Sequence, residues 1–271
     1  MENRLFSVKD KVIILTGGCG ILGGSMAKHL AGEMARVVIL DRNVEGGKKL
    51  EEEIKAEGGV ALFLETDVLD KAVLEQNKKD VLNSFGTIDV LINLAGGNMS
   101  GATIPPEKTF FDLDITAFRK VVDLNLFGTV LPTMVFAKVM ADNKKGCIIN
   151  ISSESALRPL TRVVGYGCAK AAISNFTQYM AGELAIKFGE GLRVNAIAPG
   201  FFLTEQNRAL MSNPDGSPTE RCKSVMAHTP FRRLGHPDEL LGTVQWLASD
   251  ASAFVTGTII PIDGGFDAFS I

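Results

Sequence analysis

The chain has 271 residues, of which 46% are hydrophobic, and its 28 basic and 31 acidic residues give a formal net charge of −3. This length and hydrophobic content exclude a disordered chain and suit one large α/β domain. The balanced charge leaves no surplus of cations for a nucleic-acid backbone or an anionic membrane surface, so we expect neither partner. Apolar runs such as Val12–Leu15 are strand-sized, far below the ~18 residues of a membrane span. Because no export signal is visible, we expect a cytoplasmic protein.

Short β-branched runs alternate with longer amphipathic segments, which predicts strands joined by crossover helices. The predicted strands are Lys11–Leu15, Arg36–Asp41, Val60–Glu65, Ile88–Asn93, Gly146–Ser152, Leu192–Ala198 and Thr258–Pro261. The predicted helices are Ile21–Met34, Glu45–Glu57, Lys71–Phe85, Thr116–Ala141, Gly165–Phe188 and Pro237–Ala248. Because the strands are almost continuously hydrophobic, we expect a mostly parallel seven-stranded sheet with helices on both faces, that is, a doubly wound Rossmann-type α/β fold.

No linker, repeat or low-complexity tract divides the sequence, so residues 1–271 are predicted to form a single domain. The stretch Phe201–His236 contains no predicted strand. Its length favours a substrate-binding loop or lid, although a tolerated surface insertion explains it as well. The four cysteines are scattered without a Cys-x-x-Cys pair, so the sequence predicts neither a disulfide framework nor a metal site.

A glycine-rich segment follows the first predicted strand and opens the first predicted helix. Glycines at such a turn let the backbone approach a pyrophosphate, and the N-terminus of a helix favours negative charge. A glycine-rich turn can be purely structural, but its position between a strand and a helix predicts a dinucleotide site. The candidate cofactor-binding residues here are Gly17, Gly18, Cys19, Gly20, Ile21, Leu22 and Gly23.

Asp41 ends the second predicted strand, 18 positions after Gly23. A carboxylate at this position accepts hydrogen bonds from the adenosine ribose diol and repels a 2′-phosphate, so NAD is the expected cofactor. The adjacent Arg42 is open to three interpretations: it meets a 2′-phosphate, it stacks beside the adenine, or it is a solvated loop charge. NADP is therefore not excluded.

Tyr166 and Lys170 are four residues apart, which places them one turn apart on the same helix face. Ser153 lies thirteen residues before Tyr166, after a buried strand that ends in hydroxyl side chains at the sheet edge where ligands bind. An unperturbed phenol has a pKa near ~10, so a base at this position needs a neighbouring cation, and Lys170 supplies one. The two motifs together carry more weight than either alone.

With these motifs the sequence resembles the short-chain dehydrogenase/reductase family, in its compact single-domain branch, over nearly the whole chain. The motifs are the glycine-rich turn, Asp67-Val68, Asn93-Leu-Ala-Gly96, Asn125, Ser153, Tyr166-x-x-x-Lys170, Pro199-Gly200 with Thr204, and Asp263-Gly-Gly265. The resemblance implies Tyr166 as general acid or base, Lys170 holding the nicotinamide ribose, Ser153 orienting the substrate oxygen, and Asn125 anchoring a water. For Asn125 the alternative is an amide that satisfies its own helix backbone.

The resemblance also implies further cofactor contacts. Asp67 and Val68 are expected beside the adenine, with capping of the helix near Asp70 as the alternative for Asp67. Leu94 replaces a usual asparagine, and we expect it to point into the core. The remaining contacts are expected along the ribose and nicotinamide, from Asn93, Ala95, Gly96, Pro199, Gly200, Phe202 and Thr204.

Amide and guanidinium groups around the predicted mouth favour a hydroxyl-rich anion over a steroid or fatty-acyl substrate, because an arginine binds a carboxylate bidentately. The candidate substrate-binding residues are Asn98, Ser153, Arg158, Gln206 and Arg208, with Arg158 as the main anchor. Local stretches resemble the D-mannonate oxidoreductase (fructuronate reductase) subgroup, which implies reversible hydride exchange between NAD(H) and a sugar acid such as D-fructuronate.

Three alternatives stay open. A 3-oxoacyl carrier-protein reductase or a gluconate 5-dehydrogenase-like enzyme has the same fold. A protein of a different class, a catalytically silent dinucleotide sensor, need not keep Asn125, Ser153, Tyr166 and Lys170, all of which are present. By resemblance we also expect a homo-oligomer, a tetramer or a dimer.

Overall fold

The computed structural model describes residues 4–204 and 207–268. Its seven strands form one parallel sheet in the order β3-β2-β1-β4-β5-β6-β7, which confirms the predicted doubly wound α/β fold. The switch in strand order lies between β1 and β4, and in such sheets ligands bind at the carboxyl ends near that switch. The strands are β1 (Val12–Thr16), β2 (Arg36–Asp41), β3 (Val60–Glu65), β4 (Val90–Asn93), β5 (Gly146–Ile151), β6 (Leu192–Pro199) and β7 (Ile259–Ile262).

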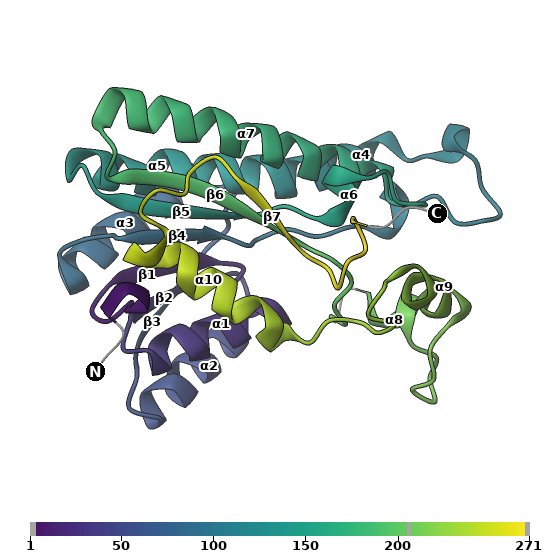
Figure 1. The fold of residues 1–271 in the computed structure, drawn as a ribbon, viewed down its shortest axis with the longest axis horizontal. Helices are drawn as coiled ribbons and strands as arrows, with labels where there is room; N and C mark the ends of the chain where they lie inside the picture. Colours follow the sequence, from purple (N-terminus) through teal and green to yellow (C-terminus); the bar gives the residue numbers. More distant parts are fainter. Residues whose placement is uncertain (1–3, 205–206, 269–271) are drawn as a thin grey trace.

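Helices cover both faces of the sheet, as Figure 1 shows. One hydrophobic cluster joins the sheet to α1, α2 and α10, and a second joins its other face to α3, α5 and α7. The helices are α1 (Ile21–Gly32), α2 (Val44–Ala56), α3 (Lys71–Phe85), α4 (Ile115–Val122), α5 (Gly128–Asp142), α6 (Glu154–Leu157), α7 (Val164–Phe188), α8 (Arg208–Met211), α9 (Glu220–His228) and α10 (Leu241–Ala248). Short 3-10 turns cover Arg4–Phe6, Ser100–Ala102, Phe110–Asp112, Pro237–Leu240 and Asp250–Ser252, and a π turn, η4, covers Asp123–Phe127.

The predicted strand Ile88–Asn93 begins two residues later in the structure, at Val90. The reason lies in Asp89, whose carboxylate accepts a hydrogen bond from the backbone N–H of Val12 at 2.8 Å. The side chain of Asp89 thus takes a place that a strand carbonyl would otherwise fill at the start of the ladder.

The segments α4, η4 and α5 form one continuous helix, Ile115–Asp142, close to the predicted helix Thr116–Ala141. By length and composition alone this helix could cross a membrane, because its most apolar window has a mean hydropathy of 1.5. That window is 56% buried inside the protein, and α5 packs on β4, β5, α3 and α7. The buried apolar side chains of this helix therefore belong to the core.

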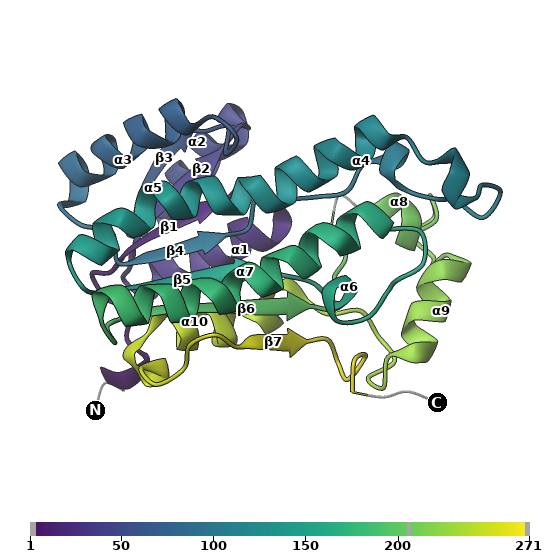
Figure 2. The same cartoon turned by 90° about the horizontal axis from the view of Figure 1, so that it is seen from above.

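The stretch 201–236 contains two helices, α8 and α9, that the sequence analysis did not assign. The Thr219 hydroxyl caps α9 by accepting a hydrogen bond from the backbone N–H of Cys222 at 3.1 Å. In Figure 2 this stretch lies beyond the carboxyl ends of the strands, across from the N-terminal end of α4. The two segments flank the edge of the sheet at which the cavities open.

Candidate active site

Two cavities lie at the carboxyl ends of the strands and share Tyr166 and Thr204 in their walls. The larger cavity, about 540 Å³, lies over the glycine-rich turn and the ends of β2 and β4. The smaller cavity, about 470 Å³, lies between the loop after β4, helix α6 and the α8–α9 region. Both volumes fall within the range of small-molecule sites.

The glycine-rich turn lies against the backbone that follows β4. Gly17 has a φ of +66°, and a Cβ at this position would lie 2.8 Å from the Cα of Ala95. A Cβ on Gly23 would lie 2.6 Å from the carbonyl oxygen of Gly17. Gly20 begins α1 as its N-cap without a side-chain cap, so the first N–H groups of the helix face the larger cavity uncovered by a side chain. Such a helix N-terminus suits a phosphate.

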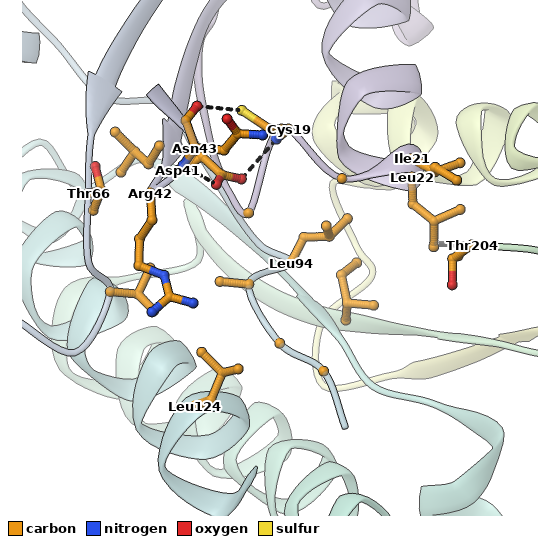
Figure 3. A pocket seen from close by; sticks show the side chains of 18 of the residues that line it. Cys19, Ile21, Leu22, Asp41, Arg42, Asn43, Thr66, Leu94, Leu124 and Thr204 are labelled. Carbon is orange, nitrogen blue, oxygen red and sulfur yellow. Dashed lines mark hydrogen bonds between the residues drawn. The ribbon is translucent and has the colours of Figure 1, made fainter. Parts of the chain in front are cut away.

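Asp41 lies at one end of the larger cavity, where Figure 3 shows it beside Cys19, Arg42 and Asn43. Its carboxylate accepts hydrogen bonds from the backbone N–H groups of Cys19, at 3.0 Å, and Asn43, at 2.9 Å. Burial and the Asp41 carboxylate raise the pKa of the Cys19 thiol to about 12, so this thiol stays protonated. The Arg42 side chain reaches along the cavity wall towards Leu124.

Tyr166 and Lys170 lie on α7, and the ammonium of Lys170 is 5.5 Å from the centroid of the Tyr166 ring. Burial raises the pKa of the Tyr166 phenol, and its hydrogen bond with Ser153 opposes that rise. Burial lowers the pKa of Lys170 to about 7, while its ammonium donates to the carbonyl oxygen of Ile151 at 2.7 Å. The three side chains form a compact group that can bind an oxygen atom and transfer a proton.

Asn125 is fully buried in the π turn η4, a type of helix distortion that often occurs at functional sites. Its amide donates to the carbonyl oxygen of Gly97 at 2.6 Å and to that of Val121 at 2.8 Å, and its oxygen accepts from the N–H of Gly97 at 3.1 Å. The contact with Val121, within its own helix, is the alternative that the sequence left open. The contacts with Gly97 hold the loop that forms the floor of the larger cavity.

A family model described as enoyl-(acyl carrier protein) reductase matches residues 20–267. The oxidoreductase UxuB of Bacillus subtilis, described as uncharacterized, is 46% identical over 274 residues and covers 97% of both chains. The chain belongs to the short-chain dehydrogenase/reductase family. It is therefore an oxidoreductase.

Solved structures of this reductase family superpose over nearly the whole chain. A candidate D-mannonate oxidoreductase from Haemophilus influenzae, solved with NAD bound, is 42% identical, covers 97% of both chains and has a TM-score of 0.92. A gluconate 5-dehydrogenase from Burkholderia cenocepacia, solved with NADP and tartrate, is 29% identical with a TM-score of 0.88, covering 98% of this chain and 99% of that one.

The structure of this short-chain dehydrogenase/reductase brings most of the predicted cofactor residues to the wall of the larger cavity. They are Gly17, Cys19, Gly20, Ile21, Leu22, Asp41, Arg42, Val68, Ala95, Gly96, Tyr166, Lys170 and Thr204. Leu94, expected in the core, does pack against the core but also lines this cavity. Gly18 and Gly23 do not line it; they permit the close packing of the turn, since a Cβ on Gly18 would lie 2.9 Å from the Ile39 side chain.

Five further predicted cofactor residues lie outside the larger cavity, namely Asp67, Asn93, Pro199, Gly200 and Phe202. The Asn93 amide is buried between strands and donates to Thr133 and Asn150, each at 2.9 Å. The Asp67 carboxylate accepts from Leu69, whereas Asp70 caps α3.

The other three predicted residues belong to β6 and the segment after it. Pro199 ends β6, and Gly200 lines the smaller cavity instead. Phe202 packs its ring on Gly235, and its carbonyl accepts from the Asn207 amide at 2.7 Å. The contact of Phe202 with Gly235, 33 residues away, is not revealed by motif spacing.

Of the predicted substrate residues, Asn98 and Ser153 line the smaller cavity, whereas Arg158 and Arg208 do not. The Arg158 guanidinium binds the Asp267 carboxylate at 2.6 Å and the Asp267 carbonyl, so it fastens the C-terminal segment to α6. Arg208 is exposed at the start of α8. Gln206 lies outside the described residues.

Two titratable residues that were not among the predicted substrate-binding residues also line the smaller cavity, Arg221 and Glu154. Arg221 comes from α9, and its guanidinium donates to the hydroxyl and carbonyl oxygens of Thr161 at 3.1 and 3.3 Å. Burial and the nearby Arg162 lower its pKa. Because α9 was not predicted, no local signal pointed to Arg221.

Proposed function

We propose that the protein interconverts a ketone and a secondary alcohol with NAD(H), on a sugar acid of the D-fructuronate and D-mannonate type. The observation that carries this proposal is the place of Tyr166, whose side chain borders both cavities. A group at this boundary can exchange a proton with a substrate in one cavity while a cofactor occupies the other.

Several residues of the larger cavity suit a dinucleotide. Gly17 packs closely on Ala95 and has no side chain to cover the backbone of the turn. The uncapped start of α1 offers N–H groups for a pyrophosphate. The Asp41 carboxylate in this cavity suits the ribose diol of NAD, and Arg42 beside it allows NADP as a second cofactor. When bound, the nicotinamide supplies or accepts the hydride.

The catalytic assignment follows from the surroundings of each side chain. The raised pKa of Tyr166 keeps its phenol protonated at neutral pH, which suits an acid that protonates the ketone oxygen during reduction. Ser153 orients that oxygen through its hydroxyl. In alcohol oxidation, the protonated form of Lys170, whose pKa is about 7, lies 5.5 Å from the centroid of the Tyr166 ring and stabilises the phenolate. Asn125 acts as a positioning residue, because it fixes the loop at Gly97.

The substrate class rests on the lining of the smaller cavity. Arg221 offers a guanidinium that can bind a carboxylate, in place of the predicted Arg158. Asn98 and Asn207 add amides suited to hydroxyl groups. A hydroxyl-rich carboxylic acid satisfies this combination, and the similar D-mannonate oxidoreductase candidate of H. influenzae and gluconate 5-dehydrogenase of B. cenocepacia support it.

The same wall also contains apolar side chains, among them Met99, Leu160 and Met211. An acyl chain would find contacts there, and a 3-oxoacyl-[acyl-carrier-protein] reductase of Synechocystis is 32% identical over 96% of this chain. The acyl thioester is therefore the competing substrate in the test.

The test is an assay of NADH oxidation with D-fructuronate, D-tagaturonate, 5-ketogluconate and an acetoacetyl thioester, repeated with NADPH. We expect turnover of at least one keto sugar acid with NADH. Turnover confined to the thioester would refute the sugar-acid proposal and leave the reductase assignment intact.

A matched pair of variants tests the carboxylate anchor. Arg221→Met is expected to raise the KM for the sugar acid by about 10- to 100-fold, because one charge-assisted hydrogen bond is lost. Lys223→Met removes an equal charge from the same helix at an exposed position paired with Glu220. Equal effects of both variants would assign the change to net charge rather than to Arg221.

We further propose that the protein functions as a homo-oligomer. Several large apolar side chains on the outer faces of α5 and α7 are exposed, including Met134, Tyr179 and Ile186. Light scattering after size exclusion measures the mass, and a monomer at micromolar concentration would contradict this proposal.

A further inference from the structure

Glu154 is the residue directly after Ser153, and it belongs to the wall of the smaller cavity. The side chain is 1% exposed to solvent. Neither carboxyl oxygen has a hydrogen-bond partner among residues 4–204 and 207–268. A buried polar group without a partner costs free energy, so a carboxyl group in this state is suited to binding a ligand that enters the cavity.

The charged groups around Glu154 disfavour its ionisation. Asp263 and Asp267 face it from the segment after β7, and Arg158, whose positive charge opposes their effect, is already bound to Asp267. Burial, followed by these two carboxylates, raises the pKa of Glu154 to about 8. At neutral pH its carboxyl group is therefore mostly protonated, with one O–H donor and one carbonyl acceptor.

The neighbouring elements add few other titratable groups. Helix α7 contributes Tyr166 and Lys170, and the Lys170 ammonium is held by Ile151. The one charged residue of β6, Arg193, bonds instead to Leu247 and Ser252 on the side of α10. Arg221 lies on the α9 wall of the same cavity.

This arrangement gives the smaller cavity two chemically different positions. A substrate carboxylate is favoured at Arg221 and disfavoured near Glu154, where Asp263 and Asp267 lie close. A hydroxyl group suits Glu154, because a neutral carboxyl both donates to it and accepts from it. In the proposed function Ser153 and Tyr166 bind the reacting oxygen. Because Glu154 directly follows Ser153, a hydroxyl group bound by Glu154 would belong to a carbon next to the reacting one.

We propose that Glu154 is a specificity-determining residue that recognises a hydroxyl group adjacent to the reacting carbon of the substrate. The proposal rests on the proposed function, and it adds the orientation of the substrate. A site that hydrogen-bonds a substrate hydroxyl discriminates strongly against an analogue without it, because the buried group is then left unpaired.

The first test compares D-fructuronate with 5-oxohexanoate, a keto acid of the same length without hydroxyl groups. The wild type is expected to prefer D-fructuronate in kcat/KM. In Glu154→Leu the ratio of the two kcat/KM values is expected to fall by about 100-fold, whereas Glu154→Gln, which keeps a donor and an acceptor, retains most of it. A ratio that is the same in all three proteins would overturn the proposal.

The second test separates this role from a structural one. Between pH 7 and 9.5 the KM of the wild type for D-fructuronate is expected to rise about tenfold, because an ionised Glu154 repels the anionic substrate. The KM of Glu154→Gln is expected to stay flat, while the kcat profiles of the two proteins coincide. Parallel KM profiles would overturn the proposal, and this comparison does not need Glu154→Leu to fold.

Failure of the proposed function gives a different result. If the wild type reduces an acetoacetyl thioester but neither six-carbon acid, the sugar-acid function is refuted. Glu154 is then tested with hydroxyacetone and acetone, which differ by the adjacent hydroxyl alone. The infrared difference between wild type and Glu154→Gln, without substrate, must also show a protonated carboxyl band at pH 7; its absence would overturn the inference for any substrate.

Discussion

The close packing of the glycine-rich turn predicts opposite effects for two neighbouring substitutions in α1. In Gly23→Ala the new Cβ would lie 2.6 Å from the carbonyl oxygen of Gly17 and 2.9 and 3.0 Å from the Cα and carbonyl carbon of Gly18. All three atoms belong to the backbone, so no side-chain rotation relieves the overlap and the turn itself must move. In Gly24→Ala the nearest atoms lie 3.9 Å away, which is an ordinary contact.

The magnitudes follow from these distances. Overpacking of this kind costs about 1–3 kcal/mol, against which the better helix propensity of alanine returns at most about 1 kcal/mol. Gly24→Ala gains the propensity without the overlap, so we expect it to stabilise the protein by about 0.5–1 kcal/mol. The unfolding free energies of the two variants should therefore differ by about 2 kcal/mol.

Urea unfolding measures the stability difference, and titration with NADH measures the effect on the cofactor site. In Gly23→Ala the displaced turn would move the N–H groups of α1 away from their positions in the wild type. We therefore expect the Kd for NADH to rise at least tenfold, which requires a loss of only about 1.4 kcal/mol of binding free energy. Gly24→Ala is expected to bind NADH as the wild type does. Stabilities within about 0.5 kcal/mol of each other, with equal affinities, would refute the packing argument.

Three further predictions concern single side chains. Tyr166→Phe is expected to lower kcat by at least about 100-fold, as loss of a general acid does, and to leave the Kd for NADH within about threefold; an equal loss of binding would argue against a catalytic role. Asp41→Ala is expected to reduce the preference for NADH over NADPH, and an unchanged ratio of the two kcat/KM values would contradict the ribose assignment. For Glu154, a folded pKa of about 8 against an ordinary value of 4.5 means that the stability contributed by its neutral form is complete below pH 4.5 and is lost as the pH rises to 8. Between these two pH values the free energy of unfolding of the wild type, measured in urea, should therefore fall relative to that of Glu154→Gln, by about 5 kcal/mol at most. Parallel stability curves would exclude the shifted pKa.

Local patterns in the sequence were enough to predict the sheet and the larger cavity. The strands are hydrophobic on both faces because helices cover both sides, and this pattern is visible in the chain itself. Gly17, Asp41 and Tyr166 each lie directly at or after an element that the pattern locates, and the carboxyl ends of parallel strands meet at one edge of the sheet. Their common place at the cavity therefore follows from the order of the elements.

The smaller cavity was beyond the sequence because its polar groups are selected by contacts distant along the chain. The sequence favoured Arg158 as the anchor, but in the structure Asp267 binds Arg158, and α9 carries Arg221 to the cavity wall instead. The sequence places Glu154 beside Ser153, but only the fold buries it near Asp263 and Asp267. Residue type and element order thus determined the reductase scaffold and the nucleotide side, whereas burial and pairing, which are sums over neighbours brought together by folding, decided which charges the substrate meets.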